Sequence, residues 1–158
     1  ADAVYVERGG RITFATDSYP GNLKTDGDEN SHIRTTILKS MRGDALGHVG
    51  MKLGAKASWE GSASSLTDLT LGNDSVWHVG RAGDIRLPVL SGSNGNIHMN
   101  RGGGDLSVGS LEGKAGFSFE RDAADATRIL GGTVIIDKAA AGSIVTIFTD
   151  RTGLESAE

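Results

Sequence analysis

Apolar and polar residues alternate along most of the chain. In almost every apolar cluster each second residue is hydrophobic, which places alternate side chains on opposite faces of a β-strand. The 3.6-residue period of an amphipathic helix is hard to find, and Gly, Asn, Asp and Ser, which are typical of turns, separate the clusters. The pattern therefore predicts a nearly all-β chain. The alternating groups are Val4/Val6, Ile12/Phe14, Val49/Met51/Leu53, Leu69/Leu71, Trp77/Val79, Ile85/Leu87, Ile97/Met99, Leu106/Val108, Phe117/Phe119, Val134/Ile136 and Val145/Ile147.

From about residue 57 to residue 120 the apolar pairs recur at a fixed interval. Trp77, Ile97 and Phe117 are 20 residues apart, and each is followed two positions later by a second apolar residue. The same phase extends 18 residues back to Trp59 and 17 residues forward to Val134. A repeat of this length, with two or three short strands in each period, is typical of a solenoid in which every period forms one coil.

We therefore predict a right-handed parallel β-helix with about 20 residues per coil. A β-sandwich is the main alternative, but it gives no reason for a large apolar pair to recur at this interval. In the β-helix, equivalent residues lie above one another about 4.8 Å apart, and His78, His98 and Ser118 alternate outward. The predicted core residues are Trp77, Val79, Ile97, Met99, Leu106, Val108, Phe117, Phe119, Val134 and Ile136.

The spacing predicts one continuous domain with three parts. Residues 1–56 form irregular coils with a loop that projects near residues 17–32, because this loop is rich in Gly, Asp and Asn. Within this part, residues 35–46 have weak helical spacing and fit a brief helix or a strand equally well. Residues 57–122 form the regular coils, and residues 123–158 form a C-terminal cap whose register between residues 123 and 136 stays open.

Composition narrows the function classes. The 158 residues carry a net charge of −4 with scattered basic side chains, so the chain has no basic stripe for nucleic acid. It contains 24 Gly, and it contains no Cys. The absence of Cys excludes thiolate catalysis, iron–sulfur clusters and disulfides. There is no run of eighteen apolar residues and no signal-peptide pattern, and strand patterns run up to both ends. We interpret the chain as an excised mature segment rather than a cytosolic protein.

Two histidine positions and one glycine run raise the question of a bound ion. His78 and His98 lie one coil apart on the same outward strand, but a zinc site takes three or four ligands and Ser118 continues the row. We interpret both histidines as solvated. His32 and His48 lack an H-x-x-x-H partner. The run 102–105 (GGGD) lacks the Lys-Ser/Thr and the helix of a phosphate loop, so it is predicted to be a turn.

The densest acidic segment, residues 26–30, offers oxygen ligands that suit Ca²⁺. It lacks the Gly and Glu positions of an EF-hand loop, so we interpret it as a solvated, mobile loop. If this loop projects from the coils, it is where we expect a receptor contact. The residues concerned are Asp26, Asp28, Glu29 and Asn30.

Carbohydrate-active β-helices are the enzymatic alternative, because they use clustered carboxylates on a solvent-facing sheet. In this sequence no set of carboxylates recurs at coil spacing so as to stack. We therefore predict that the chain is not an enzyme and has no catalytic, metal-binding or cofactor-binding residue. The carboxylates considered are Asp84, Asp105, Glu112, Glu120, Asp122 and Asp125.

Three consecutive elements carry a family resemblance. They are residues 57–63 (ASWEGSA), residues 69–71 (LTL) and residues 75–79 (SVWHV), and residues 105–122 (DLSVGSLEGKAGFSFERD) extend them. Together they resemble the C-terminal part of pertactin-like passenger domains of bacterial autotransporters, in which Trp-x-Gly, Leu-x-Leu, Trp-x-Val and Leu-x-Gly-x-Gly-x-Phe elements follow one another. The resemblance covers residues 55–153. The Asp-Lys-Leu element that usually follows is replaced by residues 128–130 (RIL).

The resemblance implies a role in type V secretion. The segment would be a stalk and autochaperone that nucleates folding of its passenger, a surface adhesin or virulence factor, outside the outer membrane. Its partners would be the rest of the passenger, a C-terminal outer-membrane β-barrel that is not in this sequence, and a host receptor or matrix protein. The implied location is the bacterial cell surface, reached through the periplasm. A carbohydrate-active enzyme or a carbohydrate- or receptor-binding module remains the alternative.

Overall fold

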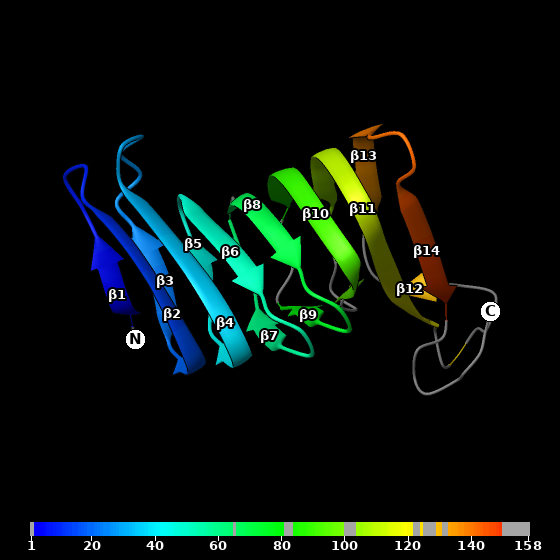
Figure 1. Ribbon diagram of the computed structural model, residues 1–158, viewed down its shortest axis with the longest axis horizontal. Helices are drawn as coiled ribbons and strands as arrows, with labels where there is room; N and C mark the ends of the chain where they lie inside the picture. The colour runs from blue at the N-terminus through cyan, green and yellow to red at the C-terminus, as the bar shows by residue number, and fades with distance from the viewer. Residues whose placement is uncertain are drawn as a thin grey trace.

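The computed structural model describes residues 2–64, 66–80, 84–99, 104–121, 124, 129–130 and 133–149. In this part of the chain the structure is all β, without a helix, and its parallel strands stack as a solenoid of about five turns with about 21 residues per turn. Figure 1 shows the coils following one another along the long axis, from the N-terminus to the C-terminus. The prediction of a right-handed parallel β-helix is therefore confirmed.

On one side of the solenoid, strands from successive coils pair to form a parallel sheet, which we call the first stack. Each strand of this stack is paired in parallel with the strand of the next coil. In spatial order the first stack contains β2 (Arg11–Pro20), β4 (His32–Arg42), β6 (Val49–Leu53), β8 (Leu66–Leu71), β10 (Ile85–His98), β11 (Leu106–Arg121) and β13 (Val134–Ala139).

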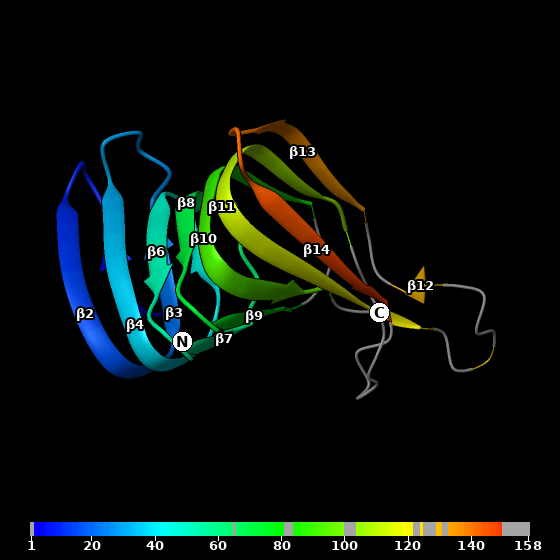
Figure 2. The same cartoon turned by 45° about the vertical axis from the view of Figure 1, so that its right-hand side comes forward.

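A second stack adjoins the first at a bend. The long strands β2, β4, β10 and β11 pass through this bend and pair in both stacks, and Figure 2 shows their curvature. Register shifts at Thr16/Ser18 in β2 and at Ser93/Gly95 in β10 mark irregular pairing near the bend, as β-bulges do. Besides the ends of the long strands, the second stack contains β7 (Ser58–Gly61), β9 (Val76–Val79) and β14 (Ile144–Thr149).

A shorter third stack closes the N-terminal coils. It contains β1 (Asp2–Val6), β3 (Asn22–Thr25) and β5 (Ala45–Leu46), and a bridge between Ala45 and Ala63 extends it by one coil. Strand β12 (Ile129–Leu130) pairs with the end of β11 and is the antiparallel exception among the described strands.

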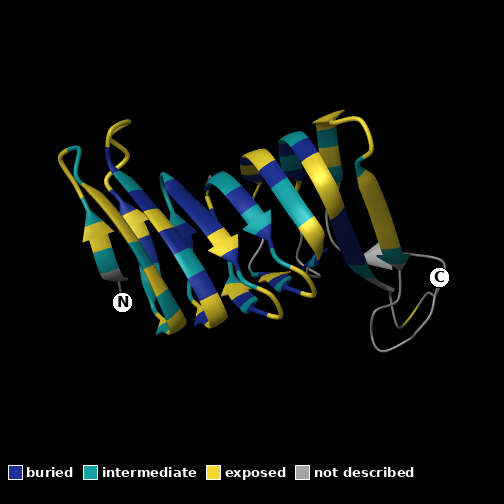
Figure 3. Cartoon of the chain, in the orientation of Figure 1, coloured by how far each residue is buried: buried dark blue, intermediate teal, exposed yellow. Residues whose placement is uncertain are grey.

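Apolar side chains fill the interior between the stacks. Figure 3 marks the buried positions as dark blue bands along the strands. In the second stack Met41, Trp59, Trp77, Ile97 and Phe117 lie at equivalent register positions on consecutive coils, and all five are buried. The spacing argument therefore identified the interior column correctly. Of the other predicted core residues, Val79, Met99, Leu106 and Val108 are buried, and Phe119, Val134 and Ile136 are partly buried against the core.

Two predictions about the column are wrong. Val134 does not continue the column of Phe117, because it pairs with Leu106 in the first stack, and Ile147 takes the position beside Phe117. The last coil is longer than its predecessors, so a constant interval misplaces the register. Ser118 was expected at the surface but is fully buried. The side chain of Asn96 donates a 2.6 Å hydrogen bond to its hydroxyl, and Phe148 occupies the adjacent position on β14.

The irregular N-terminal part is more strand-like than its composition suggests. Strand β2 continues to Pro20 and β3 occupies residues 22–25, so the connection that was expected over residues 17–32 is limited to residues 26–31. Residues 35–46, for which a helix and a strand were both open, lie mostly in β4 and β5. Pairing with the neighbouring coils makes this segment a strand, because its own apolar spacing does not distinguish a strand from a helix.

Candidate functional site

The stacked core column is the most regular chemical feature of the molecule. The rings of Trp59 and Trp77 lie on adjacent coils with their centroids 4.4 Å apart and their planes inclined by 6°. Each indole N–H also donates to a backbone carbonyl one coil earlier, that of Gly43 for Trp59 (2.9 Å) and that of Gly61 for Trp77 (3.0 Å). Both polar groups are thereby satisfied in the interior, and the coils are joined by stacking and hydrogen bonds together.

Glycines at one corner of the coils allow a close backbone contact that the apolar spacing did not predict. A Cβ atom on Gly61 would overlap the carbonyl oxygen of Gly43, and a Cβ on Gly43 would overlap that of Gly21. The backbones of successive coils approach closely here because no side chain intervenes. The sequence holds a signal for this corner: Gly61 follows Trp59 by two residues, and Gly80 follows Trp77 by three.

Short polar side chains also join the coils by capping backbone amides. The amide of Asp44 donates to Asn22 Oδ1 and the amide of Ser62 donates to Asp44 Oδ1, both at 2.9 Å. On another edge, the amide of Asp105 donates to Asp84 Oδ1 at 2.9 Å. Asp84 and Asp105 therefore do recur at coil spacing, contrary to the expectation from the sequence. Their stacking serves the backbone of the next coil.

The connection over residues 26–31 is tied to its surroundings by its own carboxylates, which argues against the expected mobile loop. Asp26 accepts the backbone N–H of Arg8 (2.9 Å) and of Asp28 (3.0 Å), and Asp28 accepts that of Asn30 (2.8 Å). The bond from Arg8, then those from Asp28 and Ser31, hold the pKa of Asp26 below its usual range. Asp26, Asp28, Glu29 and Asn30 are all exposed, so the predicted receptor-contact residues are accessible.

Two pairs of histidines lie on adjacent coils. The rings of His32 and His48 are 5.4 Å apart and inclined by 26°, and they bind the backbone carbonyls of Glu29 and Asp28. The rings of His78 and His98 are 5.5 Å apart and inclined by 54°. Partial burial lowers the pKa of His78, the charge of His98 lowers it further, and Glu60 acts in the opposite direction.

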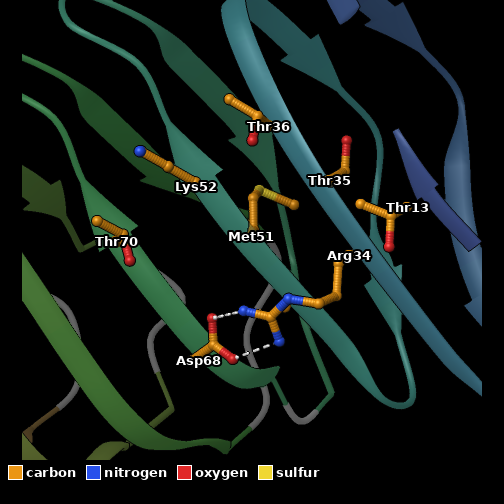
Figure 4. Close-up of a pocket in the computed structure, with 9 residues that line it drawn as sticks. Thr13, Arg34, Thr35, Thr36, Met51, Lys52, Asp68 and Thr70 are labelled. Carbon is orange, nitrogen blue, oxygen red and sulfur yellow. Dashed lines mark hydrogen bonds and ion pairs between the residues drawn. The ribbon is translucent and has the colours of Figure 1, made fainter. Parts of the chain in front are cut away.

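A hollow of about 250 Å³ opens on the outward face of the first stack, where Gly50 lacks a side chain. As Figure 4 shows, the guanidinium of Arg34 crosses this gap to Asp68, two coils away, with N–O distances of 3.1 and 3.2 Å. The rest of the lining is mostly polar. It consists of Thr13, Thr35, Thr36, Met51, Lys52 and Thr70.

Among the described residues, no three His, Asp or Glu side chains lie where they could hold one metal ion, and no helix is long and apolar enough to cross a membrane. Glu112 is exposed on β11. Asp122 and Asp125, Gly102 and Gly103 and the side chain of Glu120 lie outside the described residues.

Comparisons with known proteins add no relative. Neither the protein-family models, nor the curated proteins, nor the solved structures contain a match to this chain.

Proposed function

We propose that this chain is a non-enzymatic stalk and autochaperone of an autotransporter passenger, which folds at the bacterial surface and nucleates the folding of the remaining passenger. The observation that carries the proposal is the core column, in which large side chains on consecutive coils stack in register around the Trp59–Trp77 pair. The order of motifs in residues 57–122 supports the same family of proteins.

The energetics of such a column suit a template. Each coil contacts mainly its neighbours, so folding in a solenoid can begin in one region and propagate coil by coil. The first coil to fold loses chain entropy without a partner, whereas each later coil gains apolar burial and a row of backbone hydrogen bonds at once. A segment with two stacked tryptophans and satisfied indole N–H groups provides the stable first coils.

The chemistry of the described surface is consistent with a structural role. The stacked Asp84 and Asp105 are linked by a backbone amide, and the carboxylates of Asp26 and Asp28 cap turns of their own loop. These acidic groups are thus engaged in holding the backbone, an arrangement that serves folding. The exposed residues 26–30 are the segment that we propose for a receptor contact.

Surface display of the full-length passenger with its outer-membrane β-barrel tests the proposal. Deletion of residues 105–153 removes Phe117 and the strand that covers Ile97, so it uncovers the column and is expected to leave the passenger protease-sensitive at the cell surface. Trp77→Ala should act in the same direction, whereas His78→Ala, at the adjacent outward position, should leave display unchanged. A protease-resistant, normally displayed passenger after the deletion would refute the autochaperone role.

A carbohydrate-binding module is the second candidate, and the polar hollow around Gly50 is the observation that favours it. Its hydroxyl and charged groups are of the kind that bind sugar hydroxyls and carboxylates. Incubation with uronate polysaccharides separates the candidates: saturable binding that Lys52→Ala abolishes supports the module, and release of shortened chains supports an enzyme.

A further inference from the structure

Three consecutive coils repeat an unusual backbone conformation at the bend between the first and second stacks. Lys56, Asp74 and Asn94 have positive φ angles of 63°, 60° and 84°. Their positions are equivalent, because each lies two residues before a member of the row that pairs β7, β9 and β10. Most L-residues avoid this left-handed region, whereas asparagine adopts it readily. The path of the chain at this bend therefore favours asparagine at position 94.

The residue that follows this position is packed inside the solenoid. In the first two of these coils it is Ala57 and Ser75, and both are buried. In the coil of β10 it is Gly95, where an added Cβ would lie 2.5 Å from Leu71 Cβ and 2.6 Å from Ser75 Oγ. A side chain here would overlap the preceding coil, so the close packing favours glycine. The fold thus brings an asparagine and a glycine together in sequence at this bend.

Asn94 is exposed and is the extra residue of the bulge in β10. The register with β11 passes from Ser93 to Gly95, so Asn94 has no pairing partner on β11. Its backbone carbonyl accepts the amide of Asp74 at 3.2 Å, but no hydrogen bond to its side-chain amide occurs among the described residues. The amide of the Asn94 side chain is therefore in water and is not restrained by a hydrogen bond.

We propose that Asn94 is a site of spontaneous deamidation, with water as the co-reactant. The backbone nitrogen of Gly95 attacks Cγ of Asn94, and the new C–N bond closes a succinimide ring. The Cγ–Nδ2 bond breaks, and Nδ2 leaves as ammonia with the proton of the attacking nitrogen. Water then opens the imide at either carbonyl carbon, which leaves aspartate or isoaspartate in the chain. Because Gly95 pairs with Ala115, the attack takes place during local opening of the bulge.

The other asparagines of the described part of the chain lack this combination. Asn30 is the nearest case, because it is exposed and precedes the small residue Ser31. Ser31 has no exposed surface, its hydroxyl accepts the amide of Gly9 at 2.9 Å, and its own amide donates to Asp28 at 3.0 Å. Reaction is therefore expected at Asn94 before the others. A residue larger than glycine follows each of the remaining ones, which are Asn22, Asn30, Asn73 and Asn96.

Conversion to isoaspartate would disturb the contact between two coils. The isoaspartyl link carries the main chain through the former side chain and so lengthens it by one carbon atom before Gly95. The carbonyl that accepts the amide of Asp74 is then displaced, and Gly95 loses its close fit against Leu71. We therefore expect the thermal unfolding midpoint of the converted chain to fall. This reaction is independent of the proposed secretion role, because it requires only the folded chain and water.

Incubation of the folded chain at mildly alkaline pH, followed by protease digestion and mass spectrometry, tests the site. The attacking nitrogen reacts after loss of its proton, so alkaline pH should accelerate the conversion. We expect Asn94 to convert faster than Asn30, an isoaspartyl methyltransferase to label the aged chain, and its unfolding midpoint to fall with incubation. Asn94→Gly is the matched variant: it suits the positive φ, and it should acquire no label at this peptide and keep its midpoint.

Three results overturn the proposal. They are an Asn94 amide that stays intact in the folded chain although it converts in urea, equal conversion at Asn94 and Asn30, and an equal fall of the midpoint in Asn94→Gly. Circular dichroism before incubation establishes that the variant has formed its coils. The display experiment above reads out the proposed function separately, so failure of one proposal is distinguishable from failure of the other.

Discussion

The central coils and the last coil use the same column of positions but bury it to different extents. Trp59, Trp77, Ile97 and Phe117 have no exposed surface, because each has a coil on both sides. Ile147 continues the same column on β14 and is 50% exposed. Burial of a side chain in a solenoid thus depends on whether its coil is covered on both sides. The same residue type therefore contributes more to stability in the middle of the column than at its end.

The last coil also carries apolar side chains that do not alternate. Ile144 and Val145 are consecutive in β14 and both are exposed, and Ile135 is exposed in β13. Their strands pair with β11 on one side in the described part of the chain. Because apolar burial is the main favourable term in folding, this coil is held less firmly than those before it.

Trp77→Ala should lower the free energy of unfolding by about 3–5 kcal/mol, because it removes a fully buried ring from the middle of the column. The loss includes the stacking on Trp59 and leaves the carbonyl of Gly61 without the indole donor. Urea unfolding followed by circular dichroism measures the change. His78→Ala is the adjacent outward control, and a similar loss there would contradict the assignment of the two faces.

Gly61→Ala should cost about 3 kcal/mol, at the upper end of overpacking effects, because the new Cβ overlaps a backbone carbonyl that has little freedom to move. Gly142→Ala, in the turn of the last coil, is the comparison. Its φ of +84° strains an alanine, but no atom lies within 4 Å of the added Cβ, so we expect only about 1–2 kcal/mol. Equal effects in thermal unfolding would show that coil contact at the corner is unimportant.

Ile147→Ala should cost about 1 kcal/mol, whereas Ile97→Ala should cost about 3 kcal/mol or more, although both residues belong to one column. The reason is the exposed half of Ile147, for which little burial is lost. Hydrogen exchange gives a second measure, since amides of β14 should exchange faster than those of β10. Equal losses for the two isoleucines would mean that the last coil is as firmly packed as the centre.

The ion pair between Arg34 and Asp68 should contribute about 0.2–1 kcal/mol, because both groups are near the surface. A double-mutant cycle with Arg34→Met and Asp68→Asn isolates this term. Gly50→Ala should reduce the coupling, since its Cβ would lie 3.0 Å from the guanidinium and 3.1 Å from the carboxylate. A coupling that persists unchanged in the Gly50→Ala background would contradict the bridging geometry.

The smallest expected effect is a pH dependence at Asp26. Its pKa is lowered in the folded chain, so its ionised form stabilises the fold above the unfolded pKa, and this contribution is lost as the pH falls through the folded pKa. Unfolding curves at acidic pH should therefore show a smaller loss of stability for Asp26→Asn than for the unaltered chain. A parallel loss in both proteins would show that the backbone bonds to Asp26 do not shift its titration.

Regular spacing made the central column predictable, because Trp77, Ile97 and Phe117 repeat at one interval. The same rule failed at Val134, which pairs with Leu106 in the first stack instead of continuing the column of Phe117. The apolar repeat also gave no indication of the hydrogen bond between Asp84 and Asp105, because these two polar residues are not part of the apolar pattern. Neither the inclination of the histidine rings nor the bridge across Gly50 follows from spacing, because both depend on side-chain rotamers.

The sequence by itself determined the period of the coils, the alternation of faces and the identity of the buried column. These follow from apolar periodicity, which is a local property of the chain. The tertiary structure decided which coils are covered on both sides, which polar groups meet across neighbouring coils and where the last coil joins. Those outcomes depend on contacts between residues that are one or more coils apart, and on loop lengths that the period of the strands does not fix.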